Sequence, residues 1–164
     1  MIEEKVQIEK LWEILESVKD PEIPVLSVVD LGVVREISEQ SGQVIVTITP
    51  TYSGCPAMNV IEEDIKSTLQ QSGYEVTVET VLSPAWTTDW LSANGRKKLE
   101  EFGIAPPAEG SQNKRVLFGD EPIVRCPNCK STATKMVSQF GSTACKAHYK
   151  CKDCLEPFDY FKCI

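Results

Sequence analysis

Three stretches in the first two thirds of the chain carry apolar residues at the spacing of an amphipathic helix. They span residues 3–18, 56–71 and 92–102. The apolar positions are Ile8, Leu11, Trp12, Leu15 and Val18 in the first and Ala57, Val60, Ile61, Ile65 and Leu69 in the second. They recur every three or four residues and therefore predict one buried side on each helix. Pro21 follows the first stretch, and Gly73 and Gly103 follow the other two, as expected where helices end.

Between these helices the pattern changes to short runs rich in β-branched residues. Such runs, at 33–37, 44–48 and 75–82, predict strands. Ser41-Gly42 separates the first two and predicts the turn of a hairpin. The resulting order is α-β-β-α-β-α. We expect an α+β fold, a small sandwich with helices on one sheet.

The pattern breaks down after residue 103. Residues 104–122 begin with a Pro-Pro and a polar stretch, which predicts a linker. The tail, 123–164, is too short to bury a sufficient core unaided, so it needs a metal, disulfides or a partner. We therefore expect a first domain over 1–103, a linker over 104–122, and a metal-binding module over 123–164.

The composition is typical of a soluble globular protein, with 41% hydrophobic and 25% charged residues among 164. The first residues are acidic and lack an apolar segment, so we expect that they are not a secretory signal. No apolar run approaches the ~20 residues that span a bilayer, so we expect no membrane partner. A cytoplasmic location follows as an expectation. Thiols stay reduced there, which favours metal binding over disulfides for clustered cysteines.

Charge is distributed unevenly along the chain, whose net charge is −7. Residues 1–113 hold 8 Lys and Arg against 19 Asp and Glu, whereas residues 114–164 hold 9 against 5. This asymmetry favours two units with different partners, although a lysine-rich surface also keeps a small module in solution. The acidic first part would repel phosphates, and no basic run is interleaved with aromatic residues. We therefore expect no nucleic-acid partner.

Six of the seven cysteines lie in the last 39 residues. Four form two Cys-x-x-Cys pairs, Cys126 with Cys129 and Cys151 with Cys154, separated by 21 residues. That separation is one residue beyond the usual range for a zinc ribbon, in a hairpin of variable length. Two such pairs predict a closed tetrahedral site of four thiolates, suited to zinc or iron, with structural zinc preferred. The alternative is a cluster of free, reduced thiols.

The choice of ligands stays open because three further candidates lie close by in the sequence. Cys145 precedes a predicted strand, 146–150, that contains His148, the single histidine, and Cys163 is the penultimate residue. Any of them could replace a member of the two pairs, or help to hold a second iron or a transient cluster. A lone histidine is more often a surface or packing residue than a ligand.

Cys55 is the one cysteine outside the tail. It lies between a strand and a helix, after Gly54 and before Pro56, which suits the first helical position. We therefore expect Cys55 at or near the N-cap, where backbone N–H groups and the helix dipole favour a thiolate. Such a cysteine is reactive or binds metal. The alternative is a small buried residue.

Acidic residues at two further places are candidates for a role, and those at the first place for iron ligation. Asp20 and Glu22 lie on a proline-stiffened loop, where they could bind iron, cap a helix or simply form a polar turn. Asp30 lies in Val-Val-Asp-Leu-Gly and is expected to be a local cap.

These motifs together resemble known families. Asp-Pro-Glu-Ile-Pro-Val at 20–25, Val-Val-Asp-Leu-Gly-Val-Val at 28–34 and the Ser-Gly-Cys-Pro ending at residue 56 resemble the SufT-like iron–sulfur assembly factors, over residues 8–82. Pro-Ala-Trp-Thr-Thr-Asp-Trp-Leu at 84–91, Phe-Gly-Ser-Thr-Ala-Cys-Lys-Ala at 140–147 and Glu-Pro-Phe-Asp-Tyr-Phe-Lys-Cys at 156–163 are similar to the phenylacetate-degradation D subunits.

The resemblance implies an accessory factor rather than an enzyme. Such a factor assists delivery of iron or iron–sulfur clusters to the oxygenase and reductase subunits of phenylacetyl-CoA epoxidase, alongside iron–sulfur assembly proteins. Cys55 and Asp20 are then the cluster-handling residues. One cysteine offers one ligand, so a cluster there needs a second protomer or an outside thiol, which makes a homodimer an expectation.

Two alternatives remain beside the accessory factor. The first is a stoichiometric structural subunit of the oxygenase complex. The second is a thiol-dependent enzyme acting through Cys55, although the sequence shows no Cys-His pair for it.

Overall fold

The computed structural model describes residues 2–107 and 123–162, with side chains from residue 7 onward. The described chain divides into two compact units. The first unit runs to Trp86 and resumes over Trp90–Gly95, and the second comprises Thr87–Asp89 and continues from Arg96. Each unit has its own sheet and its own buried core.

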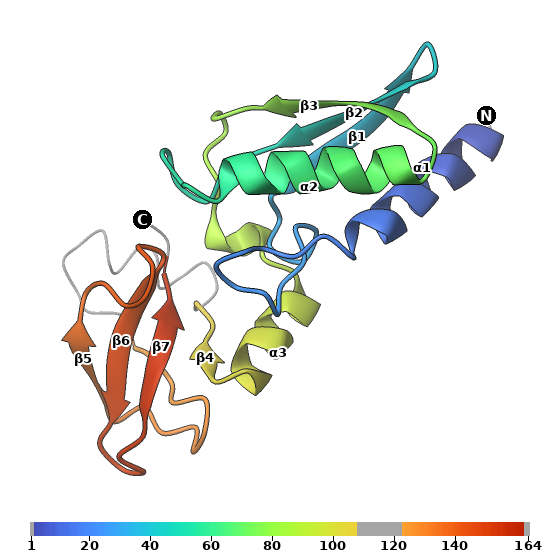
Figure 1. Ribbon diagram of the computed structural model, residues 1–164. Coiled ribbons are helices and arrows are strands. Elements are labelled where there is room, and N and C mark those ends of the chain that lie inside the picture. The colour runs from blue at the N-terminus through green and yellow to red at the C-terminus, as the bar shows by residue number, and fades with distance from the viewer. Residues whose placement is uncertain (1, 108–122, 163–164) are drawn as a thin grey trace. The chain divides into compact units, whose positions relative to one another are not determined.

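The first unit is built on a sheet of three strands, β1 (Val34–Gln40), β2 (Gln43–Ile48) and β3 (Glu75–Thr80), in that order (Figure 1). Strands β1 and β2 form the antiparallel hairpin that the sequence predicts. Ser41 and Gly42 both have positive φ, as a tight hairpin turn of this kind requires. Strand β3 runs parallel to β2, because the intervening helix returns the chain to the starting edge.

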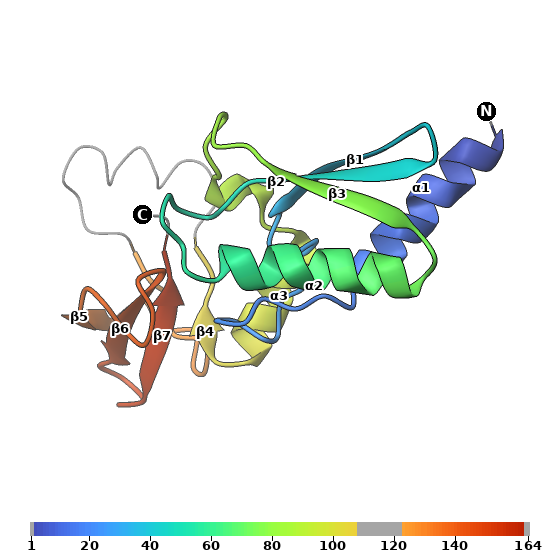
Figure 2. The same ribbon diagram turned by 45° about the horizontal axis from the view of Figure 1, so that its top comes forward.

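Two helices, α1 (Ile2–Leu15) and α2 (Met58–Gln71), lie on the same face of this sheet (Figures 1 and 2). Their predicted apolar sides are mostly buried, as Leu11, Leu15 and Leu69 show with no exposed surface. The prediction is wrong at Val60, whose side chain is 46% exposed. The buried line of α2 follows Ile61, Ile65 and Leu69 at intervals of four, and Val60 lies beside that line.

The chain after β3 packs back against the loop that precedes β1. The Trp86 indole N–H donates to the carbonyl of Leu31 at 2.9 Å. Gly32, with φ +74°, lies so close to Trp90 that an added Cβ would be 2.4 Å from the Trp90 carbonyl oxygen. A short 3₁₀ helix, η1 (Thr88–Trp90), and helix α3 (Ala93–Glu101) follow. The third predicted helix thus begins in the first unit and continues into the second.

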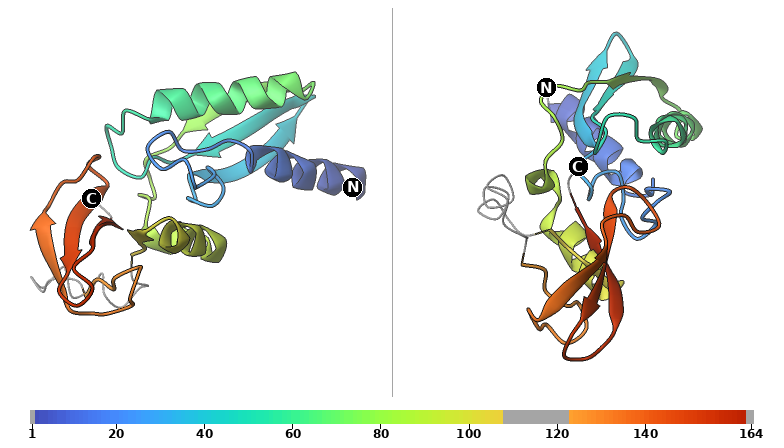
Figure 3. Two further views of the ribbon diagram at one scale, coloured as in Figure 1. Left: turned by 60° about the horizontal axis from the view of Figure 1, so that its bottom comes forward. Right: turned by 90° about the vertical axis from the view of Figure 1, so that its left-hand side faces the viewer.

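The second unit is a sheet of four strands in the order β4-β7-β6-β5. Their bounds are Ile104–Ala105 for β4, Thr134–Ser138 for β5, Lys146–Cys151 for β6 and Pro157–Phe161 for β7. Figure 3 shows the antiparallel strands β5, β6 and β7 side by side from two directions. Strand β4 pairs in parallel with β7, so two residues of the predicted linker form part of this sheet.

One cluster of buried residues in the second unit consists of Ala105, Val124, Cys126, Ala147, Tyr149, Cys151 and Phe158. Two of these seven residues are cysteines from the predicted metal site. Leu99, Ile104, Cys145 and Phe161 are also buried in this unit. The structure confirms the expected fold class, an α+β layer of helices on one sheet followed by a β module with four cysteines. Within the described residues, no helix is both long and apolar enough to cross a membrane.

Candidate metal centre and the isolated cysteine

Two tight turns carry the four paired cysteines of the second unit. The first turn holds Cys126 and Cys129, and the Lys130 N–H donates back to the carbonyl of Cys126 at 3.0 Å. The second turn leaves the end of β6 with Cys151 and Cys154. Each turn is followed by a residue with positive φ, Lys130 at 64° and Leu155 at 65°. The left-handed backbone conformation of this residue reverses the direction of the chain directly after the second cysteine of each pair.

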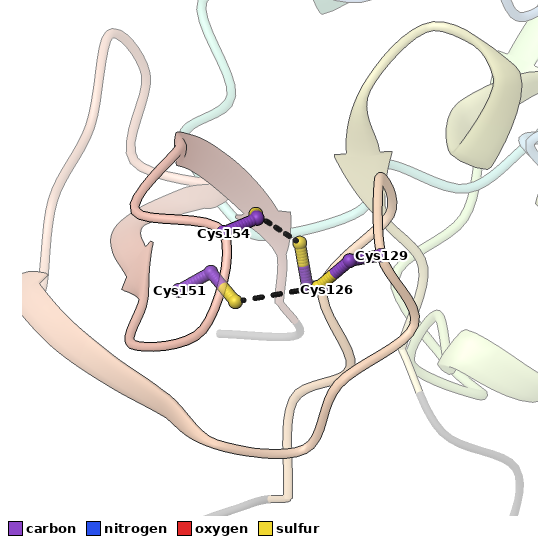
Figure 4. Close-up of side chains that lie close together, drawn as sticks. All are labelled: Cys126, Cys129, Cys151 and Cys154. Carbon is purple, nitrogen blue, oxygen red and sulfur yellow. Dashed lines mark hydrogen bonds between the residues drawn. The ribbon is translucent and has the colours of Figure 1, made fainter.

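The four Sγ atoms converge, all within 4.8 Å of one another (Figure 4). Cys126 Sγ lies 3.7 Å from Cys154 Sγ, and Cys129 Sγ lies 3.5 Å from Cys151 Sγ. Four sulfurs held at about 2.3 Å from a zinc ion in tetrahedral geometry are about 3.8 Å apart. The thiols therefore already have nearly the spacing of a four-thiolate metal site, and the donor set fits zinc.

The backbone around the second turn favours a thiolate. The backbone N–H groups of Cys154 and Asp153 donate to Cys151 and lower its pKa to about 7, against the effect of burial. The pKa of Cys129 is raised, and burial and the neighbouring thiols raise that of Cys154 to about 12. A metal-binding cysteine must give up its proton, so binding of a metal to this cluster would release protons.

The other candidate ligands of the second unit lie apart from this cluster. Cys145 is buried, and its thiol is 3.0 Å from the Thr143 hydroxyl. His148 Nδ1 is 3.3 Å from Asp159 Oδ1, across the pair of strands β6 and β7. Among the described residues, neither joins the group of four thiols. The suggestion that Cys163 substitutes for a ligand concerns a residue outside the described ranges.

Cys55 in the first unit lies two residues before the N-cap of α2, which is Ala57. Its carbonyl accepts a hydrogen bond from the Met58 N–H at 3.3 Å, and its own N–H donates to Tyr52. Ala57 has helical φ and ψ and makes no side-chain capping bond. The sequence prediction of a cysteine near the N-cap is therefore close, but Pro56 is not the first helical residue.

The surroundings of Cys55 raise the pKa of its thiol. Burial is the main cause, and the carboxylates of Glu22 and Asp20 add to it, while hydrogen bonds with the Ala57 backbone and the Tyr52 side chain oppose it. The expectation that the helix dipole favours a thiolate is thus wrong for the free protein, because partial burial and the nearby acids outweigh the backbone donors. The same carboxylates favour a bound cation.

The predicted acidic loop is held by one of its own carboxylates. Asp20 is buried, and its Oδ1 accepts hydrogen bonds from the backbone N–H groups of Glu22 and Ile23, both at 2.8 Å. This is the polar turn that the sequence left as an alternative to iron ligation. The turn nevertheless brings two acids within electrostatic reach of the Cys55 thiol, although more than thirty residues separate them in the sequence.

Asp30 forms hydrogen bonds across a long sequence distance, which the expectation of a local cap did not include. Its Oδ1 accepts hydrogen bonds from the Ser92 hydroxyl at 3.0 Å and the Asn94 amide at 3.3 Å. The Ser92 hydroxyl oxygen in turn accepts the Gly95 N–H at 2.8 Å, which caps α3. Asp30 therefore fixes the start of α3 against the loop before β1.

Sequence reasoning missed two polar side chains in the segment that leads to Cys55. The Tyr52 hydroxyl hydrogen-bonds the thiol, and a tyrosine three residues before the cysteine was visible as a signal. Thr49 is 1% exposed, and among the described side chains its hydroxyl alone is buried without a hydrogen-bond partner. It begins the same strand-to-helix segment, and nothing in the sequence distinguished it from its neighbours.

Two family models match the chain, one on each part. Residues 8–82 match a model described as an iron–sulfur cluster assembly protein, and residues 110–162 match one described as the PaaD zinc beta ribbon domain. Together they define the class of protein, an iron–sulfur assembly domain joined to a zinc ribbon. The structure and these matches confirm both parts of the resemblance read from the sequence motifs.

Similarity to a relative over nearly the whole chain identifies the family within this class. A protein of Escherichia coli (strain K12), provisionally named the D subunit of 1,2-phenylacetyl-CoA epoxidase, is 46% identical over 96% of this chain and 94% of its own. The chain belongs to this family of D subunits, PaaD. An Fe-S protein maturation auxiliary factor of Porphyromonas gingivalis (strain ATCC BAA-308 / W83) is 34% identical over 56% of this chain and 89% of its own.

A solved structure resembles the first part. The crystal structure of a domain of unknown function, DUF59, from Bacillus anthracis is 28% identical, covering 60% of this chain and 95% of that one, with a TM-score of 0.56. The names of the relatives, a subunit and maturation factors, support an accessory role related to iron–sulfur proteins.

Proposed function

We propose that this protein is a non-catalytic maturation factor for a multicomponent phenylacetyl-CoA epoxidase in phenylacetate catabolism. In this proposal it assists delivery of iron or an iron–sulfur cluster through Cys55. Its partners are the oxygenase and reductase subunits of the epoxidase and the general iron–sulfur assembly proteins, in the cytoplasm. The observation that carries the proposal is the half-buried Cys55 thiol with two carboxylates acting on it, in a unit that matches an iron–sulfur assembly family.

The chemistry of the first unit suits transient rather than permanent binding of iron. One thiol with nearby carboxylates offers few ligands, so a cargo held there leaves readily for a client with a complete set. Because the pKa of Cys55 is raised, the thiol stays protonated in the free protein and gives up its proton when iron arrives. A homodimer bridged by the cargo would supply the second thiol.

The second unit has a different role in this proposal. Cys126, Cys129, Cys151 and Cys154 hold a structural zinc ion, which the thiol spacing fits. Zinc bound there supplies a permanent cross-link between the two turns and no redox chemistry. The proposed division is then an assembly domain over 1–103, a linker, and a zinc module over 123–164 that contacts the client.

Iron in the client enzyme tests the proposal directly. A strain lacking the gene should contain epoxidase subunits at normal levels with little iron, and the wild-type gene should restore the iron. A Cys55→Ser gene should fail to restore it, whereas Cys145→Ser, which alters a cysteine outside the four-thiol cluster, should succeed. Normal iron occupancy in the deletion strain, measured by elemental analysis of the purified oxygenase and reductase, would remove the maturation role.

The name of the Escherichia coli relative favours a second candidate, a stoichiometric structural subunit of the oxygenase complex. A subunit should co-purify with the oxygenase in a fixed ratio and survive size-exclusion chromatography. A maturation factor should dissociate once iron is loaded, and so be absent from the loaded complex.

A thiol-dependent enzyme is the least supported candidate. The chain's single histidine, His148, belongs to the second unit, and the pKa of Cys55 is raised rather than lowered. A nucleophilic cysteine requires the opposite shift or an adjacent base.

A further inference from the structure

The ribbon of the second unit has an apolar hollow bordered by lysines. The hollow has a volume of about 450 Å³ and lies over β5, the end of β6 and the turn after it. Its apolar lining includes Met136, Val137 and Leu155, which are 40%, 59% and 64% exposed. Large apolar side chains that gather at one exposed place mark interaction sites more often than scattered ones do.

Three lysines surround this apolar lining: Lys135, Lys150 and Lys152. Lys135 and Lys150 are direct partners across the antiparallel pair of β5 and β6. Like charges at directly opposite positions destabilise a sheet. Within the described residues none of the three lysines forms an ion pair, whereas Lys66, Lys97 and Lys130 each pair with a glutamate. Among the described residues that line the hollow, none is acidic.

Protection of a sheet edge explains only part of this arrangement. Strand β5 is an edge strand of the described sheet, where it pairs only with β6. The register of this pair shifts after Met136, as it does at a β-bulge. A lysine and a bulge on an edge strand hinder unwanted pairing with other chains. Lys150, however, lies on the interior strand β6, and Lys152 follows it in the metal-binding turn. Protection of the sheet edge therefore does not account for the positive charges of Lys150 and Lys152 or for the apolar lining.

We propose that this hollow is a docking site for an acidic segment of a partner protein that also carries an apolar side chain. The apolar side chain lies against Met136, Val137 and Leu155, and carboxylates on either side of it pair with the three lysines. Charge complementarity selects this occupant, because the described ribbon carries unpaired positive charge around an apolar surface. This surface does not include Cys55 or the other residues of the proposed iron-handling site. The docking proposal can therefore be wrong while the proposed function holds, and the reverse.

Binding of model peptides to the zinc-loaded full-length protein tests the proposal. The probe is a short synthetic peptide in which Glu or Asp alternates with Leu or Val. Amide chemical shifts should change in Thr134–Ser138 and the end of β6, and binding should weaken as NaCl is raised. Lys135→Glu should weaken binding about three- to tenfold, and Val137→Ser should also weaken it. The matched charge change Lys10→Glu, in the other unit, should have no effect.

Other results would overturn the proposal. One such result is that a peptide of Glu and Asp alone binds as tightly as the alternating acidic and apolar peptide. The apolar lining would then contribute nothing to binding. Another is a response at the same residues to vesicles containing anionic lipid or to single-stranded DNA, with none to the acidic and apolar peptide. Unchanged binding in Lys135→Glu at full zinc content, or no binding at all, would equally exclude this occupant.

Discussion

The two cysteine regions of this protein differ in what holds them in place. In the second unit four thiols meet within 4.8 Å, and two of them belong to a buried cluster of seven residues. The first unit has an extensive aliphatic core that includes Leu11, Leu15, Ile61, Ile65 and Leu69, and its single Cys55 is only half-buried. We therefore expect the second unit to depend on its cysteines for stability and the first unit to depend mainly on aliphatic packing.

The two regions also differ in what sets the acidity of their thiols. In the cluster, backbone N–H groups lower the pKa of Cys151 to about 7, whereas burial and the neighbouring thiols raise that of Cys154 to about 12. At Cys55, burial and two carboxylates raise the pKa. The converging thiols therefore influence one another, whereas the isolated thiol responds to burial and to nearby acids.

The largest expected effect is the loss of the ribbon on removal of one ligand. Cys126→Ser should abolish zinc binding and unfold the second unit, because structural zinc contributes on the order of 10 kcal/mol to such modules. Elemental analysis should show almost no bound zinc in this variant, against about one ion per chain in the unsubstituted protein. Fluorescence of Trp12, Trp86 and Trp90, all in the first unit, should keep its thermal transition.

Cys145→Ser is the matched control for that substitution, because Cys145 is buried outside the thiol cluster. It should keep its zinc. Equal loss of zinc in both variants would mean that the ligand set is wrong. A tryptophan transition lost together with zinc would show that the first unit depends on the ribbon, contrary to the comparison.

Acidification should remove the same metal without a mutation. Protons compete with zinc for the four thiolates, so zinc affinity should fall as the pH falls. In the metal-free protein the pKa of Cys151 is lowered to about 7, whereas those of Cys129 and Cys154 are raised, so protons occupy these three thiols below about pH 7 once zinc has left. Zinc released to a colorimetric chelator should increase steadily from about pH 7 to about pH 5. Release that does not depend on pH would argue against thiolate ligands.

A smaller effect is expected from a substitution in the first unit alone. Gly32→Ala should lower the free energy of unfolding of this unit by about 2–4 kcal/mol, because the new Cβ would meet the Trp90 carbonyl at 2.4 Å and φ is +74°. Gly42→Ala, at φ +81° with open space around it, should lower it by only about 1–2 kcal/mol. Urea unfolding followed by tryptophan fluorescence measures the free energy of unfolding of both variants. Their zinc content should stay unchanged. Similar losses in the two variants would show that the close contact with Trp90 contributes little.

The smallest effect concerns the acidity of Cys55. Glu22→Gln removes a carboxylate that raises the pKa of this thiol, so the pKa should fall and the thiolate fraction at neutral pH should rise. The rate of iodoacetamide modification of Cys55, followed by peptide mass spectrometry, should increase about two- to threefold. Glu63→Gln, an exposed change on α2, serves as the control. An unchanged or slower rate in Glu22→Gln would remove the electrostatic link between the acidic loop and the thiol.

Local sequence patterns were enough to predict the order of the helices and strands in the first unit and the pairing of the four ribbon cysteines. Both follow from local rules, since helical spacing, β-branched runs and two thiols on one tight turn are properties of neighbouring residues. The family motifs, also local, related Cys55 to Asp20 before their surroundings were known.

Contacts between residues far apart in the sequence became visible only in the folded chain. There Asp30 holds Ser92 and Asn94, Ile104–Ala105 join the ribbon sheet, and Val60 is exposed. The fold also reverses the expected acidity of Cys55, because the turn at Asp20 brings carboxylates towards a partly buried thiol. Burial and electrostatic fields are set by the whole fold, and spacing along one chain does not contain them.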